Sequence, residues 1–108
     1  MNLKLKILPR AQEDVQHIFE YLAERSPQGA ADWWEAFESA ARHATDGLVE
    51  QPLAPENNST EFELRQVIFK TRAGRRYRFV FTIVANELRV LRVRGPGQPN
   101  LKADEVDQ

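Results

Sequence analysis

The stretch RRYRFVFTIVANELRVLRVR, residues 75–94, alternates large apolar residues with arginine, valine and threonine around Ala85-Asn86. A period of two is typical of β-strands, because successive side chains in a strand point to opposite faces. Together with an apolar run before it, this stretch predicts three strands, at 64–70, 76–84 and 87–94. The connections between them are short, which indicates an antiparallel meander.

The first half of the chain predicts one strand and two helices, at 2–8, 9–25 and 27–47. Apolar residues recur every three or four positions in both helical segments. Pro9 and Pro27 each suit a first helical position, and Ser26 is a good N-cap for the second helix. Gly47 is placed to end that helix. The connection between the helices is so short that we expect an antiparallel hairpin.

The predicted order is therefore β-α-α-β-β-β, which defines an α+β fold with one core. We expect the helix hairpin to cover one face of a twisted antiparallel sheet, with the first strand at an edge or beside a later strand. Trp33 and Trp34 lie on the apolar stripe of the second helix and are expected to pack in the core. Residues 1–95 are expected to form the single domain, and 96–108 a flexible or partner-ordered tail.

Charge is divided strongly along a chain whose net charge is only −1. Residues 1–61 carry a net −6, whereas residues 62–94 carry 9 basic and 2 acidic side chains, a net +7. The chain has no cysteine and no apolar run of the about 20 residues that a membrane span needs. Its two histidines have no ligand-like neighbours, so we expect no metal or cofactor, no membrane partner and a cytoplasmic location.

Residues 62–94 contain 8 arginines and only one lysine, a bias that favours recognition of carboxylates or phosphates by the planar guanidinium. Strand parity puts the aromatic residues of 77–81 on the face toward the helices and Leu91 on one face with Val93. It predicts that four arginines share the uncovered face and that two more lie at its rim: Arg76, Arg78, Arg92 and Arg94, then Arg72 and Arg75. A bulge would break this parity. The alternatives are a surface that serves solubility and internal pairing with the acidic helices.

Several short motifs occur in a characteristic order along residues 3–95. They are Ala11-Gln12-Glu13-Asp14-Val15, Ala30-Ala31, Leu48-Val49-Glu50-Gln51-Pro52, Leu64-Arg65, Tyr77-Arg78-Phe79-Val80-Phe81 and Val90-Leu91-Arg92-Val93. Their order and spacing resemble the RelE/ParE toxin superfamily of bacterial type II toxin–antitoxin (plasmid stabilisation) systems. The resemblance implies a small growth-arresting toxin that is neutralised by binding its cognate antitoxin, and that meets operator DNA only through this antitoxin.

Members of this superfamily either cleave messenger RNA on the ribosome, as RelE does, or inhibit DNA gyrase, as ParE does. By resemblance, Arg65, Arg72 and Arg78 are the catalytic candidates of a ribonuclease. RNA cleavage also needs proton transfer, but residues 95–101 contain no Tyr, His or Arg. We therefore favour a ParE-like, non-enzymatic gyrase inhibitor. The alternatives are a RelE-like endoribonuclease that acts on the ribosome and its mRNA, and an inactive toxin-like binding module.

Overall fold

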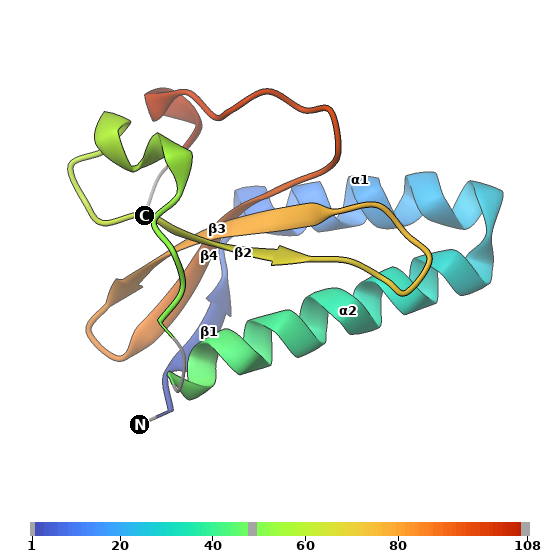
Figure 1. The fold of residues 1–108 in the computed structure, drawn as a ribbon, viewed down its shortest axis with the longest axis horizontal. Helices are drawn as coiled ribbons and strands as arrows, with labels where there is room; N and C mark the ends of the chain where they lie inside the picture. The colour runs from blue at the N-terminus through green and yellow to red at the C-terminus, as the bar shows by residue number, and fades with distance from the viewer. Residues whose placement is uncertain (1, 48–49, 107–108) are drawn as a thin grey trace.

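The computed structural model describes residues 2–47 and 50–106, and there it confirms the predicted α+β fold (Figure 1). The helices and strands are β1 (Lys4–Ile7), α1 (Pro9–Arg25), α2 (Pro27–Asp46), β2 (Arg65–Phe69), β3 (Tyr77–Val84) and β4 (Glu87–Arg94). Two 3-10 turns, η1 (Pro55–Ser59) and η2 (Ala103–Glu105), follow α2 and β4. The strand order is β1-β4-β3-β2, and β1 pairs with β4 in parallel at one edge. All other neighbours are antiparallel.

Local signals set the ends of both helices where the sequence predicts them. Pro9 and Pro27 occupy first-turn positions, where a missing N–H does no harm. The Ser26 hydroxyl accepts a hydrogen bond from the Gly29 N–H at 3.0 Å and so caps α2. Gly47 ends α2 in the left-handed conformation, with φ 68°. Leu48 and Val49, which begin the motif that ends at Pro52, lie outside the described residues.

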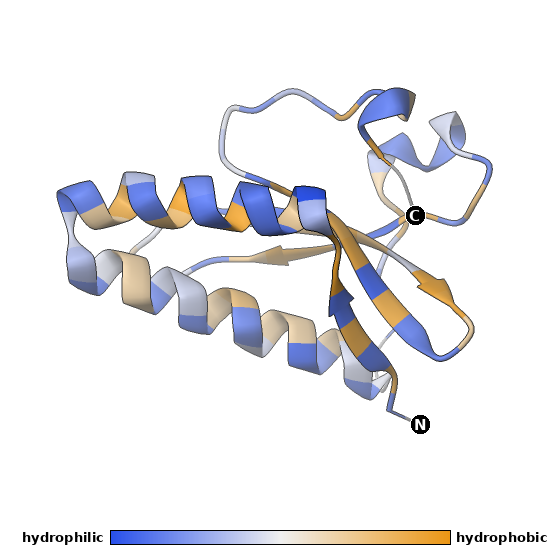
Figure 2. Ribbon diagram, turned by 180° about the vertical axis from the view of Figure 1, so that it is seen from behind, coloured by the Kyte–Doolittle hydropathy of each residue, from blue (hydrophilic) through white to orange (hydrophobic). Residues whose placement is uncertain are grey.

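The main core lies between the helix hairpin and the sheet and is largely aromatic. Trp33 and Phe37 of α2 stack with ring centroids 5.8 Å apart, and Phe37 meets Phe79 of β3 edge-on at 5.6 Å. Trp33 is 1 % exposed, so its predicted core position is confirmed, whereas Trp34 is 36 % exposed. In Figure 2, β4 alternates hydrophilic and hydrophobic residues, as expected of a strand with a buried face.

A bulge in β4 breaks the predicted parity. The successive β3 residues Val80 and Phe81 pair with Arg92 and Val90, so Leu91 is an extra residue in β4. The prediction that Leu91 shares a face with the valine two positions later was wrong. Leu91 instead packs with Val80 on the sheet face opposite the helix hairpin, which we call the second face.

This second face is covered. Residues 53–64 and the C-terminal segment pack against it in a smaller apolar cluster: Ala54, Leu64, Val80, Leu91, Leu101 and Val106. Leu101 and Val106 are each 4 % exposed, and Figure 1 shows η1 and η2 close together on this side of the molecule. Part of the segment that we expected to be flexible or partner-ordered therefore lies against the sheet. Within residues 2–47 and 50–106, no helix is long and apolar enough to cross a bilayer.

Candidate functional site

Arg78, the arginine of the Tyr-Arg strand motif, is held in a buried ion pair. Its guanidinium donates to both carboxylate oxygens of Glu56 in η1, with Nη1 3.0 Å from Oε1, and also to Gln66 Oε1 at 3.2 Å. The Glu56 side chain is only 3 % exposed. The same carboxylate accepts the backbone N–H of Leu101 at 2.9 Å, so it joins η1, β3 and the C-terminal segment.

Two opposing effects set the charge of Glu56. Burial raises the pKa of its carboxyl, because a charge loses water there, but hydrogen bonds from Arg78 and from the Leu101 N–H lower it. The net effect is a pKa below the ordinary value of 4.5. Glu56 therefore remains ionised at neutral pH and neutralises Arg78.

This lowered pKa predicts a specific acid sensitivity. Stability from Glu56 is fully present above its unfolded pKa and is lost as pH falls through its folded pKa. We expect the free energy of unfolding, measured in urea between about pH 6 and about pH 3, to fall less steeply in Glu56→Gln than in the wild type. Exposed acids contribute equally to both proteins and cancel in this comparison. Parallel pH profiles would show that Glu56 does not gain its charge-assisted bonds in the folded state.

Two of the other arginines placed by parity on an uncovered face are also engaged within the chain. Arg92 donates to both Asp14 oxygens, at 2.7 and 3.0 Å, and to the Glu105 carbonyl at 3.2 Å. Arg94 is 8 % exposed and donates to the Pro99 carbonyl at 2.7 Å.

Arg78, Arg92 and Arg94 share the face opposite the hairpin, as parity predicted, because Arg78 pairs with Arg94 and Arg92 with Val80. The prediction that this face is uncovered was wrong, because residues 53–64 and the C-terminal segment pack over it. Their role in partner binding stays a prediction.

The three candidates for RNA cleavage do not converge on one site. Arg65 pairs with Phe81 across the sheet and Arg78 with Ile68, so their side chains leave opposite faces. Arg65 binds the Gln51 carbonyl and ion-pairs with Glu50 and Glu63 at 3.0 and 2.8 Å. Arg72 lies apart from both, in the loop between β2 and β3.

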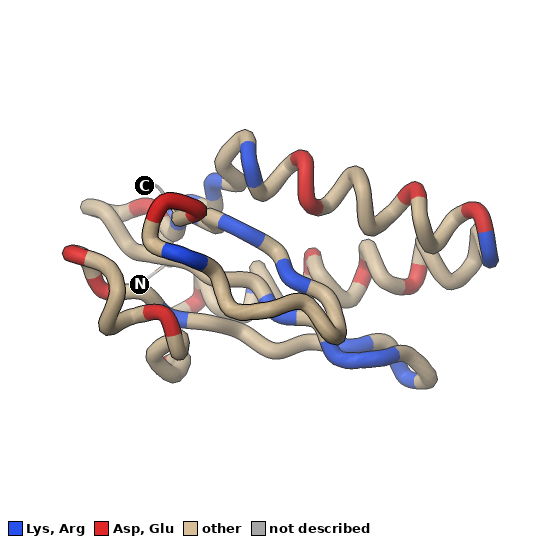
Figure 3. The backbone as a smooth tube through the Cα atoms, turned by 90° about the horizontal axis from the view of Figure 1, so that it is seen from above, with Lys and Arg blue, Asp and Glu red and all other residues tan. Residues whose placement is uncertain are grey.

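Arg72, Arg75 and Arg76 remain exposed in the β2–β3 loop, and none of them has an ion-pair partner among the described residues. Figure 3 shows the basic positions of this loop below the acidic positions of the helices. Arg72 and Arg75, predicted at the rim of the arginine face, instead line a groove on the helix side of the sheet. Arg76 does not line it.

The groove opens between the β2–β3 loop and the connected ends of the two helices and has a volume of about 1400 Å³. Its walls combine aromatic, basic and acidic side chains: Tyr21, Trp33 and Tyr77, then Lys70, Arg72 and Arg75, then Asp32 and Glu35. Burial raises the pKa of Tyr77, which keeps its hydroxyl protonated. Among residues 2–47 and 50–106, no three His, Asp or Glu side chains are grouped to hold a metal ion.

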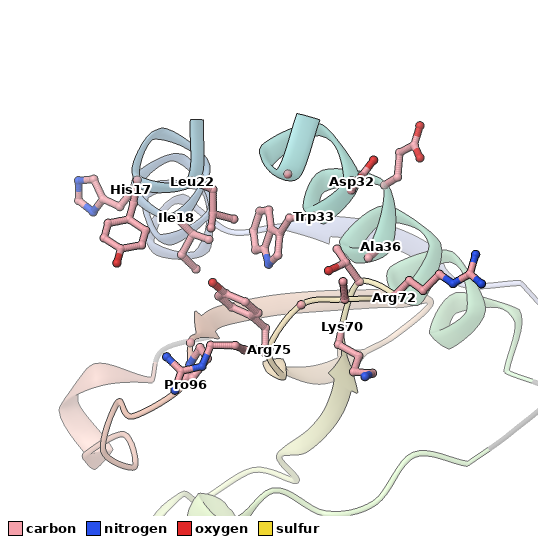
Figure 4. A pocket seen from close by; sticks show the side chains of 18 of the residues that line it. His17, Ile18, Leu22, Asp32, Trp33, Ala36, Lys70, Arg72, Arg75 and Pro96 are labelled. Carbon is pink, nitrogen blue, oxygen red and sulfur yellow. The ribbon is translucent and has the colours of Figure 1, made fainter. Parts of the chain in front are cut away.

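Trp33 is the residue of this groove whose importance the sequence did not reveal. Its indole Nε1 is buried and has no hydrogen-bond acceptor among the described residues. In Figure 4 this nitrogen points from α2 into the space above the loop. Helical spacing predicted its burial, but no sequence signal shows whether a buried indole N–H has a partner.

A helix hairpin on a four-stranded sheet, with these strand motifs, defines a small toxin-like α+β domain of the RelE/ParE class. The family model described as "ParE toxin of type II toxin-antitoxin system, parDE" matches residues 5–98. The chain therefore belongs to this family of type II toxins, which implies a cognate antitoxin as its partner. No curated protein and no solved structure shows a significant match to the chain.

Proposed function

We propose that this toxin acts by binding and inhibiting DNA gyrase rather than by cleaving RNA. The observation that carries the proposal is the separation of Arg65, Arg72 and Arg78, together with the neutralisation of Arg78 by Glu56. Cleavage by a 2′-hydroxyl needs a base, an acid and charge stabilisation around a single phosphate. An arginine already paired with a buried carboxylate supplies little net positive charge to that phosphate.

In this proposal the protein is a cytoplasmic, non-enzymatic toxin that arrests growth until its antitoxin neutralises it. The exposed loop residues Arg72, Arg75 and Arg76 are the contact candidates that remain accessible. The planar guanidinium of arginine can donate two hydrogen bonds to one carboxylate, and gyrase or the antitoxin would supply those carboxylates. Operator DNA is met through the antitoxin only.

The experiment compares the two targets with the same purified protein. We expect the toxin to abolish DNA supercoiling by purified gyrase and to create no new cleavage sites when translating ribosomes are mapped by toeprinting. The double variant Glu56→Leu/Arg78→Met replaces the ion pair by apolar residues and leaves the loop intact, so it should still inhibit gyrase. Unimpaired supercoiling, with new ribosomal cleavage that the double variant loses, would establish the RelE-like alternative instead.

A further inference from the structure

The groove contains an unsatisfied donor at its base. Trp33 is 1 % exposed, and its indole N–H finds no acceptor among the described residues. A buried donor without a partner has lost its hydrogen bonds to water and gained none within the protein, which is unfavourable. An oxygen acceptor from another molecule would satisfy this donor once the side chains that cover the nitrogen move aside, and Figure 4 shows the nitrogen on the loop side of the indole ring.

The charges on the groove walls show what kind of acceptor fits. Lys70, Arg72 and Arg75 form the wall made by the β2–β3 loop, and no ion pair within the described residues engages them. Asp32 and Glu35 lie on the opposite wall, on α2. Because the loop wall carries more charge and the Trp33 donor also seeks an oxygen, carboxylates are the complementary groups.

The size of the groove favours a polypeptide segment over a small molecule. Pockets for drug-sized ligands have volumes of about 300–1,000 Å³, and this groove, at about 1400 Å³, is larger. Tyr21, Leu22 and Tyr77 add apolar surface between the charged walls. A segment that carries both apolar and acidic side chains would match this lining.

We propose that the groove binds an acidic, partly apolar segment of the cognate antitoxin, with a carboxylate oxygen of that segment accepting the Trp33 indole N–H. The proposal rests on the toxin–antitoxin part of the proposed function and not on the choice of gyrase as target. Glu35 lies on the acidic wall, where its carboxylate would repel the acidic segment, so it should lower the affinity for the antitoxin. Lys70, Arg72 and Arg75 are the residues that should create affinity.

The chain provides its own internal control for the hydrogen bond, since it has only two tryptophans and Trp34 does not line the groove. We would titrate ¹⁵N-labelled toxin with the antitoxin encoded beside its gene and follow both indole N–H signals by NMR. The Trp33 signal should shift and exchange more slowly with solvent, while the Trp34 signal should move little. This readout needs no variant and so does not depend on a substituted core residue folding.

Affinity measurements with variants test the charges. We expect Arg72→Glu/Arg75→Glu to weaken antitoxin binding about 100-fold, because like charges would then face each other across the interface. Arg42→Glu, which changes an exposed arginine of α2 outside the groove, is the control and should change affinity far less. Glu35→Gln should strengthen binding several-fold, and Trp33→Phe should weaken it about 10-fold through loss of one charged hydrogen bond.

The outcomes separate this proposal from the gyrase proposal. Antitoxin binding with an unmoved Trp33 signal and wild-type affinity of Arg72→Glu/Arg75→Glu would overturn the groove site and leave gyrase inhibition untouched. Weaker binding in Glu35→Gln, or no antitoxin binding at all, would also overturn it. A concentration-dependent Trp33 shift in the toxin alone would assign the groove to a second copy of this chain. Uninhibited gyrase with all groove effects as expected would refute only the gyrase target.

Discussion

Replacement of Glu56 by alanine should lower the free energy of unfolding by about 3–5 kcal/mol, the usual effect of removing one partner from a buried ion pair. The substitution would leave the Arg78 guanidinium, whose side chain is 17 % exposed, without its counter-charge. It would also remove the acceptor of the buried Leu101 N–H, which belongs to the C-terminal segment. Two parts of the second face would therefore lose their common anchor at once.

Urea unfolding followed by circular dichroism measures this loss, and Glu63→Ala is the matched control. Glu63 also pairs with an arginine, Arg65, at 2.8 Å, but its side chain is 64 % exposed. An exposed pair contributes about 0–1 kcal/mol, so Glu63→Ala should unfold almost as the wild type does. Equal effects of the two substitutions would contradict the assignment of Glu56 as a buried anchor.

The double variant Glu56→Leu/Arg78→Met separates the cost of an unpaired charge from the value of the pair. Apolar residues of similar volume often replace a buried ion pair with little loss or even a gain in stability. We therefore expect the double variant to recover most of the stability lost in Glu56→Ala. A double variant as unstable as Glu56→Ala would mean that the geometry of the pair, rather than its charge balance, holds the segment in place.

The elements of the fold were predictable because their signals are local. The period of two in β3, the period of 3.6 in both helices and the caps at Ser26 and Gly47 each depend on a few neighbouring residues. The bulge at Leu91 gives no such signal. Because its neighbours in the strand are also apolar, the sequence is consistent with Leu91 on either face of the sheet.

The arrangement of the arginines was less predictable, because their partners lie far away in the sequence. Arg78 meets Glu56 across 22 residues, and Arg92 meets Asp14 across 78. The composition shows an arginine-rich segment and acidic helices. This division of charge is consistent both with arginines exposed to solvent and with arginines paired to carboxylates of the same chain. Only the packed chain shows that Arg78 and Arg92 are paired, whereas the loop arginines have no ion-pair partner within residues 2–47 and 50–106.

Replacement of Asp14 by alanine should likewise lower the free energy of unfolding by about 3–5 kcal/mol, and the reason lies in the edge of the sheet. β1 pairs with β4 only as far as Ile7 and Val90. Beyond that point, the Asp14 carboxylate takes the place of a neighbouring strand by accepting the Val93 N–H at 2.9 Å, while it also holds Arg92. One aspartate near the start of α1 thus satisfies an edge that β1 is too short to cover.

These two interactions, with Arg92 and with the Val93 N–H, explain why the Ala-x-x-Asp-Val motif has an aspartate. Substitutions of Asp14 that remove different parts of them should lower the free energy of unfolding by different amounts. Asp14→Asn keeps one oxygen acceptor but loses the charge, so it should fall between the wild type and Asp14→Ala in urea unfolding. The Val93 amide should exchange with solvent faster in Asp14→Ala than in Asp14→Asn. Glu13→Ala, which removes an exposed neighbouring carboxylate, should change neither quantity appreciably. If the Val93 amide stayed equally protected in all four proteins, Asp14 would not be the group that completes the edge of β4.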